Sequence, residues 1–214
     1  MDVLTDNLSL YGQGLWGTVQ LTLLAGALSL ALGVLIAGFR VSPVKALRAF
    51  GTGWVTVLRN TPLTLLFFAA LLGLPRFGVV LPFTVFAVLA LGAYTSAFIC
   101  EAVRAGINTV PTGQGEAARS LGMSFRQTLS LVVLPQAARS VISPIGSTLI
   151  ALAKNSAIAG SFSVTELLGT YKPLGERGFS VIWSFVWIAV GYLIVTLALA
   201  GIFGLLERRF GVPR

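Results

Sequence analysis

The sequence predicts an all-α polytopic membrane protein with five transmembrane helices, and both its composition and its apolar runs indicate this. Of the 214 residues, 56% are hydrophobic and only 10% are charged, with a mean hydropathy of +0.89. Soluble domains carry about a quarter charged residues, so this chain has too few charges to cover a water-soluble fold. It also contains several apolar stretches of about 20 residues, the length of helix that crosses the hydrocarbon core. We therefore expect lipid to surround most of the chain.

Four spans are predicted from long apolar runs. They lie at about 17–39, 82–103, 140–160 and 181–206. The first contains no charged residue and ends before Arg40, and the last ends in the string Glu207-Arg208-Arg209. These charged residues mark where the spans leave the membrane.

A fifth span is shorter and needs an earlier start. The apolar run between Pro62 and Pro75 would make only about 21 Å of helix, which is less than the hydrocarbon thickness of about 30 Å. We therefore place this span at about 58–75. Residues 44–58 carry apolar side chains on one stripe and Lys45 and Arg48 elsewhere, so we expect them to lie in the membrane interface and tilt inward.

The basic residues predict the orientation of the spans. The chain has 15 Lys and Arg against 7 Asp and Glu, a net charge of +8, and Lys and Arg are retained on cytoplasmic loops during insertion. With the N-terminus outside and the C-terminus cytoplasmic, only Arg76, Lys172 and Arg177 face outward. The basic residues on the cytoplasmic side are then Arg40, Lys45, Arg48, Arg59, Arg104, Arg119, Arg126, Arg139, Arg208, Arg209 and Arg214. Topology thus explains the excess charge, and we expect no nucleic-acid partner.

Residue content excludes several kinds of chemistry. The sequence has no His and one Cys, so it offers no disulfide framework, no Cys/His zinc site and no His-based catalytic triad. It also lacks a Gly-rich phosphate loop followed by Lys and Ser or Thr. We therefore expect no catalytic residue, no metal site and no ATP hydrolysis by this chain itself.

The longest hydrophilic connection, at about 105–139, faces the cytoplasm in this topology and greatly exceeds the usual loop of about 4–6 residues. It contains Glu116-Ala117-Ala118, then Gly122 and later Leu134-Pro135. This pattern resembles the EAA signature of ABC-importer permeases, with Val132 where Ile is usual. The resemblance implies two short helices, turned at Gly122, that dock into a cleft of a cytoplasmic ATPase.

The residue types of this motif suit docking. Small Ala side chains let a helix seat closely in a groove, Glu116 offers a charged contact, and Gly122 permits a sharp turn. The alternative is that the segment is simply an amphipathic helix, because Glu, Ala, Arg and Leu all favour helices. The length of the match and its place in the one long cytoplasmic loop favour docking.

The resemblance covers most of the chain and narrows the branch of the family. The stretches that carry it include GTVQLTL (17–23), RVSPVKALR (40–48), RNTPLTL (59–65), AGINTV (105–110) and ALAKNSAIA (151–159). They are similar to the polar-amino-acid permeases, and most of all to glutamate-uptake permeases of actinobacterial type. The chain is thereby identified as a member of this branch, with the type I importer fold.

That resemblance implies a permease subunit of an ATP-driven ABC importer, located in the cell membrane, which takes up a polar amino acid, namely glutamate. It implies a second permease chain, either a sister subunit or a second copy, and two cytoplasmic ATPase subunits. ATP and Mg would be bound by those subunits, with no cofactor on this chain. An extracellular solute-binding protein would deliver the substrate.

One charged residue, Lys154, lies well inside an apolar span, and ionisable groups in a membrane are costly enough to suggest a function. We expect Lys154, Asn155 and Ser156 to line the substrate pathway, with Lys154 meeting a substrate carboxylate or holding a neighbouring Glu. By the resemblance, Asn155 stands where many relatives carry Asp, and the loss of that charge agrees with an anionic substrate. The alternative is that Lys154 lies near the outer end of its helix and extends to water.

Further candidates lie toward the cytoplasmic end of the spans. Arg59 and Thr61 could present donors to a carboxylate at the inner end of the pathway. Arg59 could equally be a topology anchor that pairs with lipid phosphate. Glu101 and Arg104 are three residues apart on one helical face, so we expect them to pair with each other in a structural or gating role.

Two other function classes would also fit a polytopic chain. An ion-coupled secondary transporter predicts two halves of similar hydropathy with a broken helix in each, whereas this chain has five unequal spans and one long inner loop. In a membrane scaffold without an ATPase partner, the EAA-like loop would be incidental.

Overall fold

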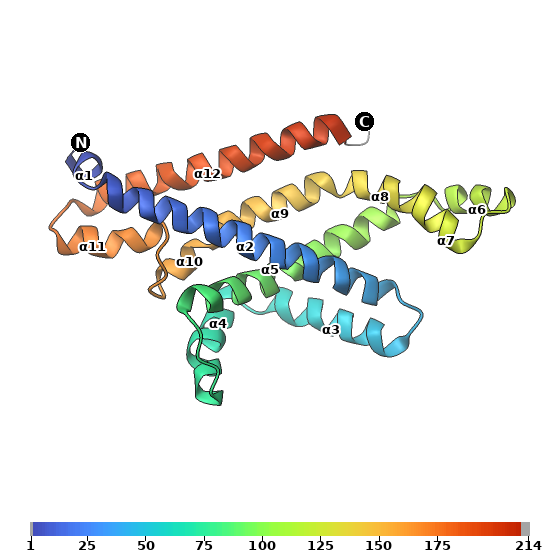
Figure 1. Ribbon diagram of the computed structural model, residues 1–214, viewed down its shortest axis with the longest axis horizontal. Coiled ribbons are helices and arrows are strands. Elements are labelled where there is room, and N and C mark those ends of the chain that lie inside the picture. Colours follow the sequence, from blue (N-terminus) through green and yellow to red (C-terminus); the bar gives the residue numbers. More distant parts are fainter. Residues whose placement is uncertain (1, 211–214) are drawn as a thin grey trace.

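The computed structural model describes residues 2–210, and every element assigned there is helical. The predicted all-α class is therefore confirmed. Arg214, one of the basic residues assigned to the cytoplasmic side, lies outside the described range. The bundle has two distinct ends, with α1 and α11 at one and α6 and α7 at the other (Figure 1). These short helices are α1 (Asp2–Thr5), α6 (Thr112–Ser120), α7 (Phe125–Gln127) and α11 (Tyr171–Glu176).

Three helices are each long and apolar enough to cross a membrane. They are α2 (Leu8–Val41), α5 (Phe83–Asn108) and α12 (Val181–Phe210). α2 and α5 pack closely because glycines lie between them. A Cβ on Gly33 would come within 2.5 Å of Ile99 Cγ2, and one on Gly92 within 2.6 Å of Leu28 Cδ2. Small residues are the usual means of close helix approach in membranes.

The chain between α2 and α5 is sharply bent. α3 (Lys45–Asn60) lies against α2 and α5, and the chain then turns by 106° into the segment Leu63–Phe77. That segment comprises α4 (Leu63–Phe68), the π-helical turn η1 (Ala69–Gly73) and the 3₁₀ turn η2 (Leu74–Phe77). Thr61 has an extended backbone with φ −101° and ψ 128°, because a residue before proline disfavours the helical conformation.

This bend falls at Thr61 and Pro62, inside the range 58–75 that was expected to form the fifth span. Residues 44–58, expected in the membrane interface, form most of a helix that packs on α2 and α5, while Val44 and Leu47 at its start are exposed. The amphipathic pattern is real, but its apolar stripe meets other helices: Gly51, Val55 and Leu58 are buried.

A second bent pair joins Phe125–Ser140 to Ile142–Gly160 at an angle of 45°. Its elements after α7 are η3 (Thr128–Val133), α8 (Leu134–Ser140), α9 (Ile142–Asn155) and α10 (Ala157–Gly160). If each bent pair is one span, the described residues hold up to five candidate spans; the long helices alone give three. The upper number equals the predicted five.

Two buried clusters hold α2, α3, α4, α5 and α9 together, and a third, made of Val3, Tyr11, Leu167, Leu174 and Ile188, attaches α12 to α1, α2 and α11. The larger of the first two joins α2, α4, α5 and α9, and its largest members are Leu21, Phe67, Phe86, Leu91 and Leu152. The smaller joins α2, α3 and α5 and comprises Ile36, Ala37, Val55, Leu58, Ala97 and Cys100. The smaller cluster lies next in sequence to Arg40, Arg59 and Glu101, and so fixes the helices that carry these charged residues.

Candidate functional site

The segment that carries the EAA-like motif forms a hairpin of short helices projecting from one end of the bundle (Figure 1). α6 ends at a turn in which Gly122 has φ +80°, in the left-handed region that favours glycine. The Met123 N–H donates to the Ala118 carbonyl at 3.2 Å across this turn. Bonds of this kind satisfy the last carbonyls of a helix, so Gly122 occupies the predicted turn.

The second helix of the hairpin begins with a capping box that the sequence reasoning missed. The Ser124 hydroxyl accepts from the Gln127 N–H at 3.3 Å, and the Gln127 side-chain oxygen accepts from the Ser124 N–H at 2.9 Å. Ser followed three residues later by Gln is the sequence signature of this cap. The cap fixes the path of the chain directly after the turn.

The residues of the motif divide between the inside and the outside of the hairpin. Glu116 and Ala117 are exposed, whereas Ala118 is buried. Leu134 and Pro135 begin α8 and are exposed. The hairpin therefore presents Glu116 and Ala117 outward, while Ala118 contributes to its internal packing.

The hairpin also exposes large apolar side chains. Leu121, Phe125 and Leu131 are 84%, 77% and 67% exposed, and Arg119 and Arg126 beside them are exposed as well. Apolar side chains gathered with charged ones on a projecting element are typical of a protein-binding surface. These residues extend the predicted docking surface beyond the motif itself.

A groove between α5 and α9 contains Asn155, one of the three residues predicted to line the substrate pathway. Its cavity of about 300 Å³ is lined by Tyr94, Thr95, Phe98, Ser147, Thr148, Ala151, Leu152 and Asn155. Hydroxyl and amide groups on membrane-spanning helices are costly against lipid tails, so they usually face a partner or a polar pathway. Asn155 thus lies where a pathway could pass.

The neighbours of Asn155 have different surroundings. Lys154 is exposed, and no carboxylate of the described residues lies within ion-pair distance of it. Ser156 is fully buried and its hydroxyl donates to the Ala153 carbonyl at 2.8 Å, at the break between α9 and α10. Of the three residues, only Asn155 lines the groove and Ser156 faces the core.

An ionic group joins α2, α3 and α5 near the end that carries the hairpin. The predicted pair is present: Arg104 Nε and an Arg104 terminal nitrogen donate to Glu101 Oε2 at 3.1 and 2.9 Å. The other oxygen, Oε1, accepts from Arg40 and lies 3.8 Å from an Arg59 terminal nitrogen. Three arginines therefore surround one carboxylate, where the sequence predicted a single pair.

Beside this group lies a cavity of about 360 Å³ lined by Arg40, Val55, Thr56, Arg59, Asn60, Phe98 and Glu101. The Arg59 guanidinium carbon lies 5.4 Å from the centre of the Phe98 ring, a typical cation–π arrangement. Thr61, the other inner candidate, does not line this cavity, and its hydroxyl donates to the Val57 carbonyl at 2.8 Å.

At the opposite end, Glu166 is a fully buried carboxylate that the sequence reasoning missed. One oxygen accepts from the Gly169 N–H at 2.6 Å and the other accepts from the Tyr192 hydroxyl. Burial raises the pKa of this carboxyl above its ordinary value, and the hydrogen bonds that it accepts oppose the rise. Its signal in the sequence is slight: it is the only acidic residue between Glu116 and Glu176.

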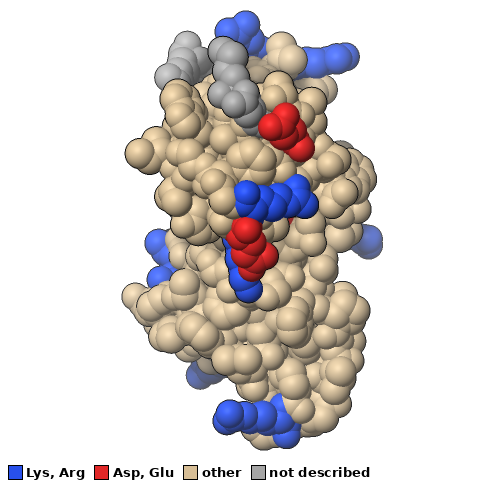
Figure 2. Space-filling view, turned by 90° about the vertical axis from the view of Figure 1, so that its left-hand side faces the viewer, with Lys and Arg blue, Asp and Glu red and all other residues tan. Residues whose placement is uncertain are grey.

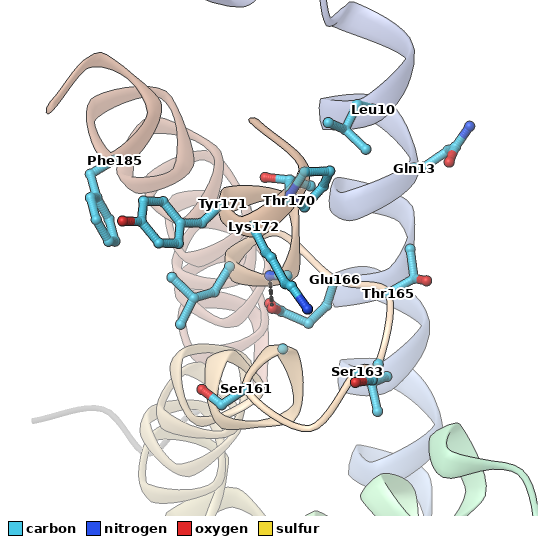
Figure 3. Close-up of a pocket in the computed structure, with 15 residues that line it drawn as sticks. Leu10, Gln13, Ser161, Ser163, Thr165, Glu166, Thr170, Tyr171, Lys172 and Phe185 are labelled. Atoms are coloured by element: carbon cyan, nitrogen blue, oxygen red, sulfur yellow. Dashed lines mark hydrogen bonds between the residues drawn. The ribbon is translucent and has the colours of Figure 1, made fainter. Parts of the chain in front are cut away.

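Glu166 lines a pocket of about 700 Å³ together with Gln13, Ser161, Ser163 and Thr165; because it lies on the outside in the predicted orientation, we name it the outer pocket. Figure 3 shows these side chains coming from α2 and from the connection between α10 and α11. Seen from this end, the molecular surface is largely uncharged, with a few separate Lys, Arg, Asp and Glu side chains (Figure 2).

Among residues 2–210, no three His, Cys, Asp or Glu side chains are grouped so that they could hold a metal ion. The candidate sites thus consist of a protein-binding hairpin, a polar groove, an ionic group and an outer pocket. Together they fit the translocation of a polar solute and the binding of partner proteins.

Comparisons with known proteins agree with this assignment. Residues 29–212 match the family described as "Binding-protein-dependent transport system inner membrane component". The chain is 38% identical over 209 residues to "Probable glutamine ABC transporter permease protein GlnM" of Bacillus subtilis, covering 98% of this chain and 97% of that protein. It is 40% identical over 213 residues to "Glutamate transport system permease protein GluC" of Corynebacterium efficiens, covering 93% of each.

Solved structures show the same fold. The chain superposes with a TM-score of 0.92 and 31% identity on a chain of "Crystal structure of an amino acid ABC transporter with histidines", covering 96% of each. A methionine ABC transporter, MetNI, in inward-facing conformations gives a TM-score of 0.78 at 22% identity, covering 96% of this chain and 98% of that chain. The predicted relationship to polar-amino-acid permeases is confirmed.

In these transporters the ATPase is a separate subunit, ATP is bound there, and the permease carries no cofactor of its own. The permease works with ATPase subunits and with a binding protein. This chain belongs to the binding-protein-dependent transport system inner membrane components and is the inner-membrane permease of an ABC amino-acid importer.

Proposed function

We propose that this permease imports glutamate together with a second permease chain, either a sister subunit or a second copy. The observation that carries the proposal is the positive character of the candidate pathway: Lys154 adjoins the groove, and three arginines share one carboxylate at its inner end. Cations along a pathway favour an anionic solute. The relative of 40% identity is named as a glutamate transport system permease, and this agrees with glutamate as the substrate.

The chain has five spans in this proposal, with the N-terminus outside and the C-terminus in the cytoplasm. The orientation is supported by the basic residues, because eleven of them fall on the connections and ends assigned to the cytoplasm. The outer pocket and α11 would then face the solute-binding protein, which delivers the amino acid from outside.

Glu116, Ala117, Gly122, Leu134 and Pro135 form the motif part of the docking surface for the ATPase, and Ala118 supports it from inside the hairpin. Each of two permease chains would hold one of two cytoplasmic ATPase subunits, which bind ATP and Mg. When ATP binding draws the ATPase subunits together, their movement is passed to the hairpins and from there to α8 and α9. The 45° bend between the segments containing these helices is a place where such a movement can change the groove.

In the groove, the Asn155 amide can donate to a substrate carboxylate, while the nearby hydroxyls of Thr148 and Ser147 supply further polar contacts. Lys154 adds a positive charge beside them. Glu101 and Arg104 form a structural or gating pair on α5, and Glu101 also pairs with Arg40 at the end of α2, so that the two helices are joined at the inner side.

Glutamine is a second candidate substrate, favoured by the 38% identical relative named as a glutamine permease and by the amide-lined groove. The test is uptake of labelled glutamate by proteoliposomes that contain the complete importer, with unlabelled glutamate, glutamine and aspartate as competitors. We expect glutamate to compete most strongly. Stronger competition by glutamine would make it the substrate, and no ATP-dependent uptake of either would overturn the proposal.

A further inference from the structure

The three arginines around Glu101 are not equivalent. Arg104 binds one carboxylate oxygen through two nitrogens, and Arg40 donates to the other oxygen. Arg59 lies 3.8 Å from that second oxygen, which is too far for a hydrogen bond. Arg59 is therefore the one arginine of the three that makes no hydrogen bond to the carboxylate and keeps all its donors for another acceptor.

The charge of the group points to an acidic ligand. Arginine is always protonated in proteins, so three arginines and one carboxylate leave an excess of two positive charges. No other carboxylate in the described part of the chain pairs with them. The side chains of Arg40 and Glu101 are only 16% and 22% exposed, whereas Arg59 is 45% exposed. Arg104 is 39% exposed, but it binds Glu101 through two nitrogens and does not line the cavity beside the group, so Arg59 is the exposed arginine that presents the excess charge to this cavity.

The cavity beside Arg59 has the size and groups of a small ligand site. Its volume of about 360 Å³ lies in the usual range for ligand pockets of about 300–1,000 Å³. The Phe98 ring lies under the guanidinium and restrains it, while Thr56 and Asn60 add polar side chains to the wall.

This cavity is also adjacent to the groove between α5 and α9. Phe98 lines both of them, with Asn155 in the groove and Arg59 in the cavity. A solute that leaves the groove past Phe98 therefore meets Arg59 next.

We propose that Arg59, Thr56, Asn60 and Phe98 form an inner anion site, in which Arg59 transiently binds the side-chain carboxylate of an acidic amino acid on its way to the cytoplasm. The inference rests on the proposed function of glutamate import. Glu101 holds Arg40 and Arg104 and also attracts Arg59, so the carboxylate of the substrate competes with a resident carboxylate. That competition keeps binding weak enough for release, as conduction requires.

The test compares Arg59→Gln, Arg59→Lys and Arg48→Gln in the complete importer, using ATP-dependent uptake of labelled glutamate and labelled glutamine into proteoliposomes. Arg48 is the matched control, because it lies on the same helix, is exposed and has no ion pair among the described residues. We expect Arg59→Gln to lower kcat/KM for glutamate on the order of tenfold, since one charge-assisted contact is lost. Glutamine uptake should change by less than about twofold.

Arg59→Lys should recover part of the glutamate uptake, because it keeps the charge but not the planar donor geometry. Arg48→Gln should leave both substrates unchanged. Equal losses for glutamate and glutamine in Arg59→Gln, or no loss, would overturn the inner anion site. A loss that appears only in vesicles containing anionic lipid would instead make Arg59 a lipid anchor. If the unaltered importer takes up no glutamate, the proposed function itself is wrong, and this is seen before any variant is compared.

Discussion

The two ends of the bundle each shield one carboxylate, and they satisfy it by opposite means. Glu101, near the end with the docking hairpin, is surrounded by three arginines. Glu166, near the end with α11, accepts from the neutral Tyr192 hydroxyl and the Gly169 N–H, and no Lys or Arg of the described residues pairs with it. Glu101 is thus surrounded by charged donors, whereas Glu166 is held by neutral donors.

The difference between the two networks determines whether each carboxylate can exchange its partners with an incoming ion. Neighbouring ions can exchange partners with an incoming ion, so a charged network with excess cations suits the handling of an anionic solute. A carboxylate held by fixed neutral donors has no such exchange. Glu166 is enclosed further by Gly160, where any Cβ would collide with its carboxylate. Through Tyr192 it fixes the connection between α10 and α11, the outer connection in the proposed orientation, against α12.

The largest predicted effect lies at the docking end. Glu116→Lys places a cation where the hairpin presents an exposed carboxylate, and we expect it to abolish ATPase association and to reduce uptake by about 100-fold or more, because a reversed charge at an interface is repulsive. Co-purification of the ATPase with the tagged permease measures this directly. Glu207→Lys is the control, since Glu207 is also exposed but lies on α12, outside the hairpin. Normal ATPase binding by Glu116→Lys would contradict the docking assignment.

The next effect concerns stability at the outer end. Glu166→Ala leaves the Gly169 N–H and the Tyr192 hydroxyl without their acceptor in a buried place, and should cost about 3 kcal/mol of unfolding free energy. Glu166→Gln keeps one acceptor oxygen and should cost about 1 kcal/mol. Thermal unfolding of the purified permease in detergent measures the loss of stability in each of the two variants. Equal stability of both variants with the unaltered protein would show that Glu166 does not hold the outer connection.

A smaller loss of stability is expected at the inner end. Glu101→Gln leaves three arginines close together without a counter-charge, and should cost about 2 kcal/mol, less than a fully buried pair because the group is partly exposed. The cost should shrink at high salt, since salt screens repulsion between partly exposed charges. The cost of Glu166→Gln should not depend on salt. A salt-independent loss in Glu101→Gln would contradict the difference between the two ends.

Local spacing explains which features the sequence predicted. Glu101 and Arg104 lie on one face of one helix, so their pairing follows from the helical repeat, and Gly122 marks the turn of the hairpin by its conformational freedom. Ser124 and Gln127 carried an equally local capping signal that could have been read. The all-α class likewise follows from composition and the length of apolar runs.

Tertiary packing explains what the sequence did not show. Arg40 is 61 residues from Glu101 and reaches it only because α2 packs on α5. Glu166 lies in the connection after α10 and accepts from Tyr192 on α12, 26 residues away, so its burial against that helix has no local signal. Pro62 carries a local signal for a break that the predicted span at 58–75 did not use, and the angle of 106° depends on how α3 and α4 each pack on α5.

The smallest predicted effect concerns Lys154, which contributes charge beside the groove rather than a paired contact. Lys154→Met should raise KM for glutamate by about threefold with kcat little changed, because an exposed charge contributes about 0.5 kcal/mol or somewhat more to attraction of an anion. Lys45→Met removes an exposed charge from α3, away from the groove, and should have no effect. If Lys154→Met also leaves KM unchanged, Lys154 extends to water at its helix end and does not take part in transport, and the charge that favours an anion would then lie at the inner end alone.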